Sequence, residues 1–489
     1  MEAVQIGSRR ELLVDDELID EMSEGAELRL HHPEPREVVL RTDRPWEGSM
    51  STYFTVFRDG EIYRLYYCGW ELDLERSAGD GTGLCQPHEM WICYAESEDG
   101  LGWRRPELDI VPWEERRTNI VWRGAGEKQH GVHGFAPFKD PNPDCDPAVA
   151  YKAVGADRRA TQGHLYAMGS SDGVHWSLLR EEPILRHDED GKFDSQNLAF
   201  WDAHRGEYRA YVRDFRHGRR AIRTATSRDF MDWTETQWLE YPGAPEEQLY
   251  TNQVQPYGRA PQIFVGFPSR YVQREWSSAV EALPEPEHRR KRAQVNERFG
   301  TAVTDGLFMS SRDGRTFRRW GEAFIRPGPQ LRGNWAYGDN YQGWGMIETP
   351  SALEGAPREL SFYAREGVWR GTEVALRRYS LRLDGFVSLN APRSGAEFTT
   401  RPLEFEGRWL ELNFSTSAAG SIRVEIQDPD GTPIDGFSDD ECVPVIGDEL
   451  SRRVRWGEGG ELGHLSGRPV RLRFLMQDAD LYAFRFCGE

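Results

Sequence analysis

Short stretches of apolar, aromatic and β-branched residues, separated by turn-forming residues, recur along most of this chain. Five of them are strongly aromatic and similar to one another, namely residues 63–68, 151–154, 208–212, 263–267 and 360–363. Side chains of these types favour strands, and short runs between turn signals are typical of antiparallel sheets. The pattern therefore predicts an all-β fold made of five similar units.

A turn-like phrase follows these strands and also recurs. It contains Ser and Asp, in three cases followed by Gly, and it precedes an aromatic residue at Trp103, Trp176, Trp233 and Phe317. Gly tolerates positive φ and Asp hydrogen-bonds the backbone of a turn, so each phrase predicts a hairpin. We expect the four acidic residues to lie on the turn between the third and fourth strands of a sheet: Asp99, Asp172, Asp229 and Asp313.

The unequal spacing of these phrases excludes a short-period solenoid and suits small sheets joined by variable loops. Radial repetition of such sheets is a β-propeller. The predicted fold class is all-β, with a five-bladed β-propeller followed by a C-terminal β-sandwich. The expected blades cover residues 45–112, 130–185, 193–241, 249–325 and 334–389.

After residue 392 the pattern changes to cleanly alternating strands. Their even spacing is typical of an antiparallel sandwich, so we expect a catalytic propeller domain over residues 1–392 and a β-sandwich domain over residues 393–489. Residues 10–35 are expected either to close the propeller ring or to pack on the sandwich. The charged residues 273–299 are an insertion in blade four, interpreted either as a solvated, partly helical excursion or as a lid or oligomer contact.

Composition and charge exclude several classes of partner. The chain has 489 residues, 17 of them Trp, and a formal net charge of −20. Such an acidic surface repels phosphate backbones and anionic membranes, so we expect no nucleic-acid and no membrane partner. The six cysteines show no Cys-x-x-Cys spacing, and neither a secretory signal nor an apolar span is visible. We therefore expect a soluble, cytoplasmic protein with no bound metal.

Two motifs carry a resemblance to a known group of enzymes: Leu12-Leu13-Val14-Asp15-Asp16 and Pro45-Trp46-Glu47-Gly48. With five blades and a following sandwich, the chain resembles the glycoside hydrolases of families 32, 43, 62, 68 and 130, and especially bacterial family 32-like hydrolases. The Trp-Met-Asn-Asp-Pro-Asn-Gly, Arg-Asp-Pro and Glu-Cys signatures of the invertase group are not present intact. The resemblance implies a carbohydrate substrate, no required cofactor, and room for an axial calcium ion as in relatives.

The first strand of every propeller blade begins at one mouth of the axis, so residues at the blade starts become neighbours. Glycoside hydrolysis needs two carboxyl groups, and the predicted pair is Glu47 as base or nucleophile and Asp194 as acid. Asp214 is the predicted stabiliser of the transition state, and Asp214, Asp339 and Glu348 are the reserve candidates if the predicted pair does not carry the reaction. The predicted substrate-binding residues are Trp46, His133, Gln196, Asn197, Arg213, Tyr250, Asn252, Asn340 and Tyr341.

Each of these residues also has a purely structural interpretation. Glu47 could be a solvated loop residue, Asp194 a strand cap and His133 a packing residue. Arg213 and Asp214 could form a surface ion pair. These alternatives stay open at the level of sequence.

The predicted activity is hydrolysis of a fructofuranosyl or arabinofuranosyl substrate, or of a related small oligosaccharide. A mannoside-type phosphorylase on the same fold is one alternative, with Arg213, Arg270 and Arg365 as candidate phosphate ligands. A non-catalytic carbohydrate-binding propeller is the other.

Overall fold

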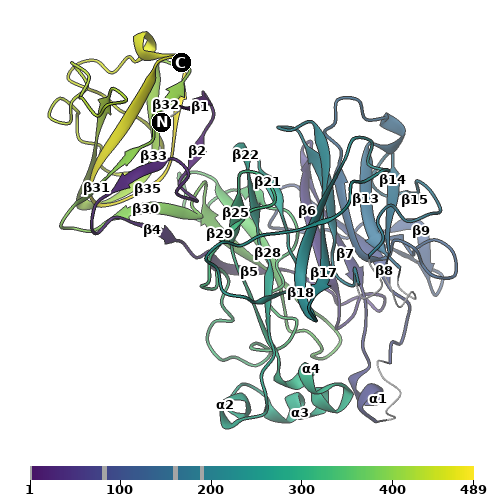
Figure 1. Ribbon diagram of the computed structural model, residues 1–489. Helices are drawn as coiled ribbons and strands as arrows, with labels where there is room; N and C mark the ends of the chain where they lie inside the picture. The colour runs from purple at the N-terminus through teal and green to yellow at the C-terminus, as the bar shows by residue number, and fades with distance from the viewer. Residues whose placement is uncertain (1–2, 80–84, 158–163, 188–191, 489) are drawn as a thin grey trace.

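The computed structural model describes residues 3–79, 85–157, 164–187 and 192–488. The chain is all-β, as predicted, and its strands form two bodies that lie side by side (Figure 1). One body holds five four-stranded antiparallel sheets, and the other holds a ten-stranded sheet with both chain termini. In the described part of the chain, the α-helices are α1 (Leu74–Gly79), α2 (Ser278–Glu281), α3 (Pro286–Val295) and α4 (Glu297–Thr301), and the 3₁₀ turns are Pro147–Val149 and Gly463–Leu465.

The five sheets are alike in their strand order. The first contains β6 (Thr52–Asp59), β7 (Ile62–Gly69), β8 (Trp91–Ser97) and β11 (Ile120–Trp122). The second contains β12 (His133–Lys139), β13 (Tyr151–Ala156), β14 (Leu165–Ser170) and β15 (Ser177–Leu178). The third contains β16 (Leu198–Asp202), β17 (Glu207–Arg216), β18 (Arg219–Ser227) and β19 (Gln237–Trp238). The fourth contains β21 (Gln255–Tyr257), β22 (Ala260–Gly266), β25 (Met309–Ser311) and β26 (Arg318–Arg319). The fifth contains β27 (Ile347–Thr349), β28 (Glu359–Glu366), β29 (Ala375–Arg382) and β5 (Glu34–Arg41).

The first strands of these sheets lie next to one another. Strand β6 contacts both β12 and β27, and β12 contacts β16. Buried glutamines add polar links between sheets, because the Gln253 amide donates to the Gln196 side chain at 2.7 Å and to the Gln342 carbonyl at 2.9 Å. Residues far apart in sequence are thus brought together where the first strands begin.

The repeated turns have nearly identical hydrogen bonds. In the first, the Asp99 carboxylate accepts from the backbone N–H groups of Leu101 and Gly102 at 2.8 and 2.9 Å. Gly100 adopts a φ of +77°, and in the third turn Phe230 takes the corresponding conformation with a φ of +69°. All four predicted Asp residues follow the third strand of a four-stranded sheet and precede its fourth, so the predicted turn position is confirmed.

The outer strands of the first and fifth sheets differ from the expected blade limits. The fifth sheet ends with β5, which pairs with β29, whereas the expected last strand, β30 (Val387–Ala391), pairs with β4 (Glu27–Leu30) and β35 (Pro469–Cys487). The expected limits of 334–389 were therefore wrong, because an N-terminal strand covers the open edge of β29. Blade one also extends past residue 112 to β11, since the hairpin of β9 (Leu108–Trp113) and β10 (Arg116–Thr118) intervenes.

The ten-stranded sheet draws on both ends of the chain. Its other strands are β1 (Val4–Gly7), β2 (Glu11–Leu12), β3 (Ile19–Met22), β31 (Ala396–Thr400), β32 (Leu403–Phe405), β33 (Trp409–Gln427) and β34 (Asp448–Arg453). The N-terminal segment of residues 10–35 thus follows the second alternative, since β2, β3 and β4 join the C-terminal body, whereas the strand that completes the fifth sheet, β5, lies almost entirely beyond that segment. Strand pairing accordingly does not follow a division at residue 392.

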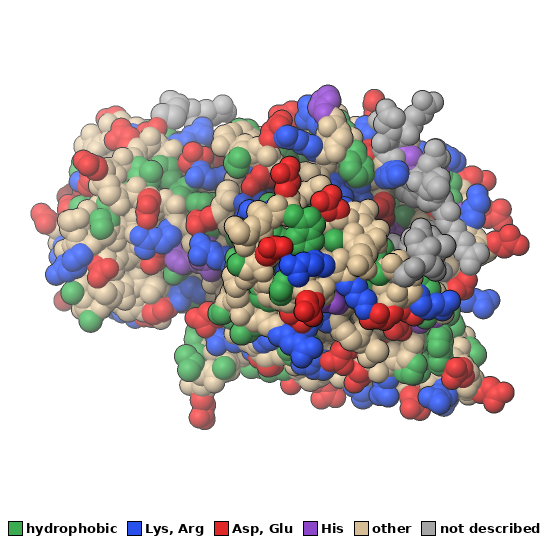
Figure 2. Space-filling model, turned by 90° about the horizontal axis from the view of Figure 1, so that it is seen from below, with side chains coloured by type: hydrophobic (Ala, Val, Ile, Leu, Met, Phe, Trp, Pro, Cys, Tyr) green, Lys and Arg blue, Asp and Glu red, His purple; other side chains and the backbone are tan. Residues whose placement is uncertain are grey.

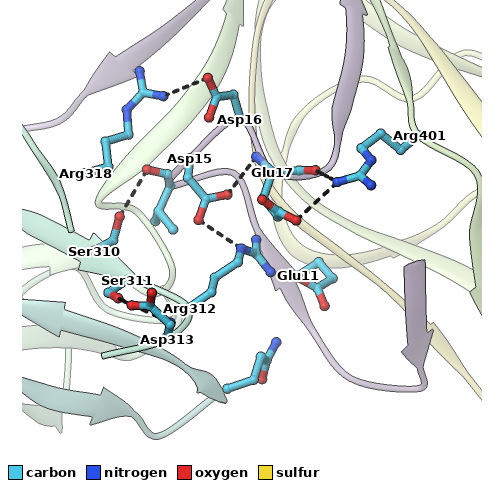
Figure 3. Close-up of polar contacts among 12 residues, drawn as sticks. Glu11, Asp15, Asp16, Glu17, Ser310, Ser311, Arg312, Asp313, Arg318 and Arg401 are labelled. Atoms are coloured by element: carbon cyan, nitrogen blue, oxygen red, sulfur yellow. Dashed lines mark hydrogen bonds and ion pairs between the residues drawn. The ribbon is translucent and has the colours of Figure 1, made fainter. Parts of the chain in front are cut away.

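The Leu12 to Asp16 motif lies where the two bodies meet (Figure 3). The Arg312 guanidinium binds the carboxylates of Asp15 at 2.9 Å and Glu11 at 2.8 Å. Ser310 donates to the Val14 carbonyl at 3.2 Å. The motif on which the resemblance partly rests is therefore part of an interface with the fourth sheet.

The charged insertion is helical. Helices α2, α3 and α4 lie between β23 (Ser269–Val272) and β24 (Val303–Gly306), which form a separate small sheet with β20 (Gln248–Leu249). Helix α3 contacts α1, and Lys291 forms an ion pair with Glu75 across this contact. These helices lie at the lower end of the five-sheet body in Figure 1.

Candidate functional site

The starts of the first strands and the inserted helices lie on the same side of the molecule, which Figure 2 shows from below. Acidic and basic side chains are interspersed over this face, with apolar side chains among them. His133 begins the first strand of the second sheet, and most of the predicted site residues of the third to fifth sheets lie in the segments that lead into their first strands.

Asp194 lies just before β16 with 64% of its side chain exposed. Its Oδ1 is 3.5 Å from His133 Nε2, at the start of β12, and its Oδ2 is 3.6 Å from an Arg213 Nη atom on β17. The side chains of both partners are buried, at 10% and 1% exposure. The structure thus brings together three of the predicted residues around one solvent-facing carboxylate.

Tyrosines surround this group. The Tyr53 ring lies 5.3 Å from the His133 ring, edge on, and Tyr250 lies 5.1 Å from Tyr341. The Tyr337 hydroxyl donates to the Tyr250 hydroxyl at 2.9 Å. Burial raises the pKa of Tyr250, which therefore stays neutral and presents an apolar ring with one polar edge.

Two arginines stack on these rings. The guanidinium of Arg220 lies 4.9 Å from the centre of Tyr250, and that of Arg365 lies 4.4 Å from the centre of Tyr341. Cation–π contacts of this kind hold a guanidinium and an aromatic ring in a fixed relative position. Tyrosine rings and guanidinium groups in fixed positions therefore surround the Asp194 carboxylate.

The predicted amide residues are buried and already hydrogen-bonded within the protein. Gln196 donates to Thr55 Oγ1 at 2.9 Å, and Asn197 accepts from the Arg213 N–H at 2.8 Å. Asn252 accepts from the Val254 N–H at 3.3 Å, and Asn340 donates to the Thr304 carbonyl at 3.2 Å. These contacts position the first strands, and substrate binding by the four amides stays a prediction.

Glu47 is fully buried and belongs to a different network. Its carboxylate accepts from the Tyr67 hydroxyl at 2.5 Å and binds the Arg105 guanidinium at 2.8 Å. Trp46 joins the same network through a 2.7 Å hydrogen bond to Asn119. Burial raises the pKa of Glu47, against the opposing charge of Arg105. Among the described contacts none joins Glu47 to Asp194.

Asp214 is also enclosed. It accepts from the backbone N–H groups of Lys192 at 2.9 Å and Phe215 at 2.8 Å, and it pairs with Arg223 at 3.2 Å. The Arg213–Asp214 dipeptide is therefore not an ion pair at the surface, because the two side chains have different partners.

Asp339 is the carboxyl group that the predicted pair left out. It is 1% exposed, and one oxygen accepts from the Val368 N–H at 3.1 Å while the other has no hydrogen-bond partner among the described residues. Burial raises its pKa to about 7, despite the nearby charge of Arg292 on α3. The signal in the sequence was the same as for Asp194: an acidic residue just before a first strand.

Within the described residues, no group of three or more His, Cys, Asp and Glu side chains is placed to hold a metal ion. An axial calcium ion thus stays a prediction. No helix of the described chain has the length and apolar character needed to cross a membrane.

No protein-family model matches the sequence, and no curated protein is significantly similar to it. Solved structures do show similarity. A family 32 β-fructofuranosidase from Bombyx mori is 11% identical, with 94% of each chain covered and a TM-score of 0.41. A structure from the family 130 mannoside phosphorylases, described with hydrolases that target β-1,2 mannosidic linkages in Candida mannan, is 13% identical over 75% of this chain and 96% of that one, with a TM-score of 0.42. An N-acetylgalactosamine deacetylase from F. plautii is 12% identical over 72% and 96%, with a TM-score of 0.43.

Glycoside hydrolases are among the solved structures similar to this chain. The similarity is distant, since each of these TM-scores is below 0.5. The activity has to be argued from the site itself.

Proposed function

We propose that the five four-stranded sheets are the blades of a five-bladed β-propeller and that the ten-stranded sheet is a β-sandwich. Contacts of β6 with β12 and β27, and of β12 with β16, support the propeller, as does the N-terminal strand β5, which completes the last sheet and leaves no open edge on β29. One continuous apolar core supports the sandwich, with Phe398 stacked on Phe474 at 4.6 Å and Phe405 on Phe486 at 3.7 Å.

The protein is, in this proposal, a glycoside hydrolase whose site lies at the mouth of the propeller. The observation that carries the proposal is the exposed Asp194 carboxylate, held between buried His133 and Arg213 and surrounded by tyrosines. Aromatic rings stack on the apolar face of a sugar, and the Asp194 carboxyl group is one of the two that glycoside hydrolysis needs.

The second carboxyl of the proposal is Glu47. Burial raises the pKa of Glu47, which is the direction that a general acid requires, and Asp194 then takes the role of base or nucleophile. This assignment reverses the roles expected from sequence. It requires that Tyr67 or Arg105 release the Glu47 carboxyl when substrate binds.

Hydrolysis is favoured over phosphorolysis because two of the three candidate phosphate-binding arginines already have partners within the protein. Arg270 is bound to Asp305 at 2.6 Å and to Glu247 at 2.8 Å, and Arg365 donates to the Gly338 carbonyl at 2.6 Å. Both guanidinium groups already have partners, which leaves Arg213 of the three candidate phosphate ligands. A basic phosphate pocket is therefore poorly supported.

The test is release of reducing sugar or aryl alcohol from a panel of aryl furanosides and pyranosides, with and without inorganic phosphate. We expect turnover that does not depend on phosphate and that falls at least a hundredfold in Asp194→Asn, since general acid or base participation contributes about 10²–10⁴. The matched control is Asp232→Asn. Asp232 lies in the turn between β18 and β19, and 84% of its side chain is exposed. Strict dependence on phosphate would contradict the assignment as a hydrolase.

A further inference from the structure

A cavity of about 840 Å³ lies between the fifth sheet and the segment that follows the fourth sheet. Strands β5, β28 and β29 contribute one wall, and residues 324–334 contribute the other. Cavities that bind small ligands usually measure about 300–1,000 Å³. The Asp194 group described above does not line this space.

Asp339 and Asn340 line the cavity where the chain enters the fifth sheet. The second oxygen of Asp339 has no hydrogen-bond partner among the described residues, although the residue is only 1% exposed. A buried polar atom without a partner is costly, and such atoms are rare unless a bound molecule satisfies them. Burial raises the pKa of Asp339 to about 7, so near neutral pH the carboxyl can either donate or accept a hydrogen bond.

The charged side chains around the cavity are largely paired with one another. Arg377 binds Glu366 at 2.6 Å, and Arg41 binds Glu373 at 2.9 Å. Arg370 is paired with Glu285 of the insertion. Paired charges of this kind offer no strong attraction for a phosphate or another anion, but their oxygen and nitrogen atoms can still bind hydroxyl groups.

The rest of the lining is largely apolar. It includes Pro35, Val38, Phe324, Pro327, Pro329 and Tyr379. A ligand that suits this cavity has an apolar face for the proline and aromatic side chains and several hydroxyl groups for Asp339 and the paired charges. These are the properties of a neutral sugar ring.

We propose that this cavity is a second carbohydrate-binding site, distinct from the Asp194 site, which takes one neutral sugar unit with Asp339 as the buried hydrogen-bonding anchor. The proposal does not rest on the proposed hydrolysis, because it concerns binding alone. It holds even for a chain with no glycosidase activity.

Binding of neutral methyl glycosides tests the proposal, with ligand-observed NMR and calorimetry as readouts. The probes are the methyl glycosides of glucose, galactose, mannose and arabinose, offered to the full-length Asp194→Asn protein so that the first site is chemically silent. Three variants are then made in that protein. Val38→Trp fills the cavity, Asp339→Leu removes the anchor, and Asp339→Asn keeps a hydrogen-bonding side chain of the same size.

We expect at least one probe to bind, with affinity lost in Val38→Trp, reduced at least tenfold in Asp339→Leu, and kept within about threefold in Asp339→Asn. Leu353→Trp, at a residue with 72% exposure that does not line the cavity, should bind normally. Absence of binding by all four probes overturns the proposal, as does unchanged binding in Val38→Trp. If the wild-type protein shows no turnover but the methyl glycosides still bind in the cavity, the result contradicts only the proposed hydrolase function.

Discussion

Asp194 and Asp339 show how strongly the surroundings of one residue determine its chemistry. Both are acidic residues just before a first strand, yet the Asp194 side chain is 64% exposed whereas Asp339 is 1% exposed. The sequence could predict a polar residue at each strand start, since strand starts converge in a propeller. It could not predict which would be buried, because the surroundings of Asp339 include the charge of Arg292, which belongs to an insertion earlier in the chain.

Replacing Asp339 should change how stability depends on pH. Its folded pKa of about 7 lies above the unfolded value of 3.8, so the folded protein binds more protons than the unfolded protein between these limits. Stability therefore falls as pH rises through this range, by up to about 4 kcal/mol if this group acts alone. We expect urea denaturation to show a smaller loss between pH 5 and pH 8 in Asp339→Asn than in the wild-type protein. Equal losses in the two proteins would show that Asp339 titrates normally.

At the scale of elements, the repeated turns were the most predictable feature of the chain. Their Asp side chains bind backbone N–H groups two and three residues ahead, so the sequence phrase itself encodes the local structure. The outer strand of the fifth sheet could not be predicted in this way. It pairs residues 34–41 with residues 375–382, and alternation within a strand does not specify so distant a partner.

Removal of one turn carboxylate should weaken its sheet without unfolding the protein. Asp313 accepts from the N–H groups of Arg315 and Thr316, each at 2.7 Å, and also pairs with Ser311. We expect Asp313→Ala to lower the free energy of unfolding by about 1–3 kcal/mol, because two backbone donors lose their acceptor. Chemical denaturation measures the change, and Asp430→Ala, in an exposed turn of the other body, is the comparison. A change in Asp313→Ala below that of Asp430→Ala would contradict this account of the turns.

At the scale of the whole molecule, the two bodies are connected by the chain, which crosses between them, and by ion pairs at their contact. The chain crosses between them before β5 and after β29, and Arg312 binds Glu11 and Asp15 at the contact shown in Figure 3. The sequence indicated a change of pattern near residue 392. It left open whether the N-terminal strands join the last strands or close the five-sheet body, since their pairing depends on contacts that span nearly the full chain.

The Arg312 contact should contribute measurably to stability. Glu11 is fully buried, so loss of Arg312 leaves a buried carboxylate whose remaining charged partner among the described residues is Arg9. We expect Arg312→Ala to lower the free energy of unfolding by about 3 kcal/mol. Arg318→Ala, which removes a pair 3.6 Å long with an 80% exposed Asp16 side chain, should have an effect below about 1 kcal/mol. Equal effects of the two substitutions in thermal or urea unfolding would contradict a stabilising role for the Arg312 contact with Glu11 and Asp15.

Truncation after residue 392 should yield insoluble protein. Strands β1, β2, β3, β4 and β30 all take partners from the ten-stranded sheet, and loss of β31 to β35 would leave unpaired edges and exposed apolar side chains. The soluble fraction after expression, compared with that of the full chain, is the measurement. A soluble and active fragment would show that the five-sheet body folds alone.

The effect of Asp194→Asn on glycoside turnover tests the central claim most directly. With a substrate found in the aryl glycoside panel, the account predicts that the variant folds like the wild-type protein, judged by circular dichroism and thermal midpoint, and is at least a hundredfold slower. Asp232→Asn should be as active as the wild-type protein. Turnover by Asp194→Asn above a tenth of the wild-type rate would contradict the claim that this carboxylate takes part in the reaction, and a wild-type protein that cleaves no glycoside of the panel would contradict the proposed activity.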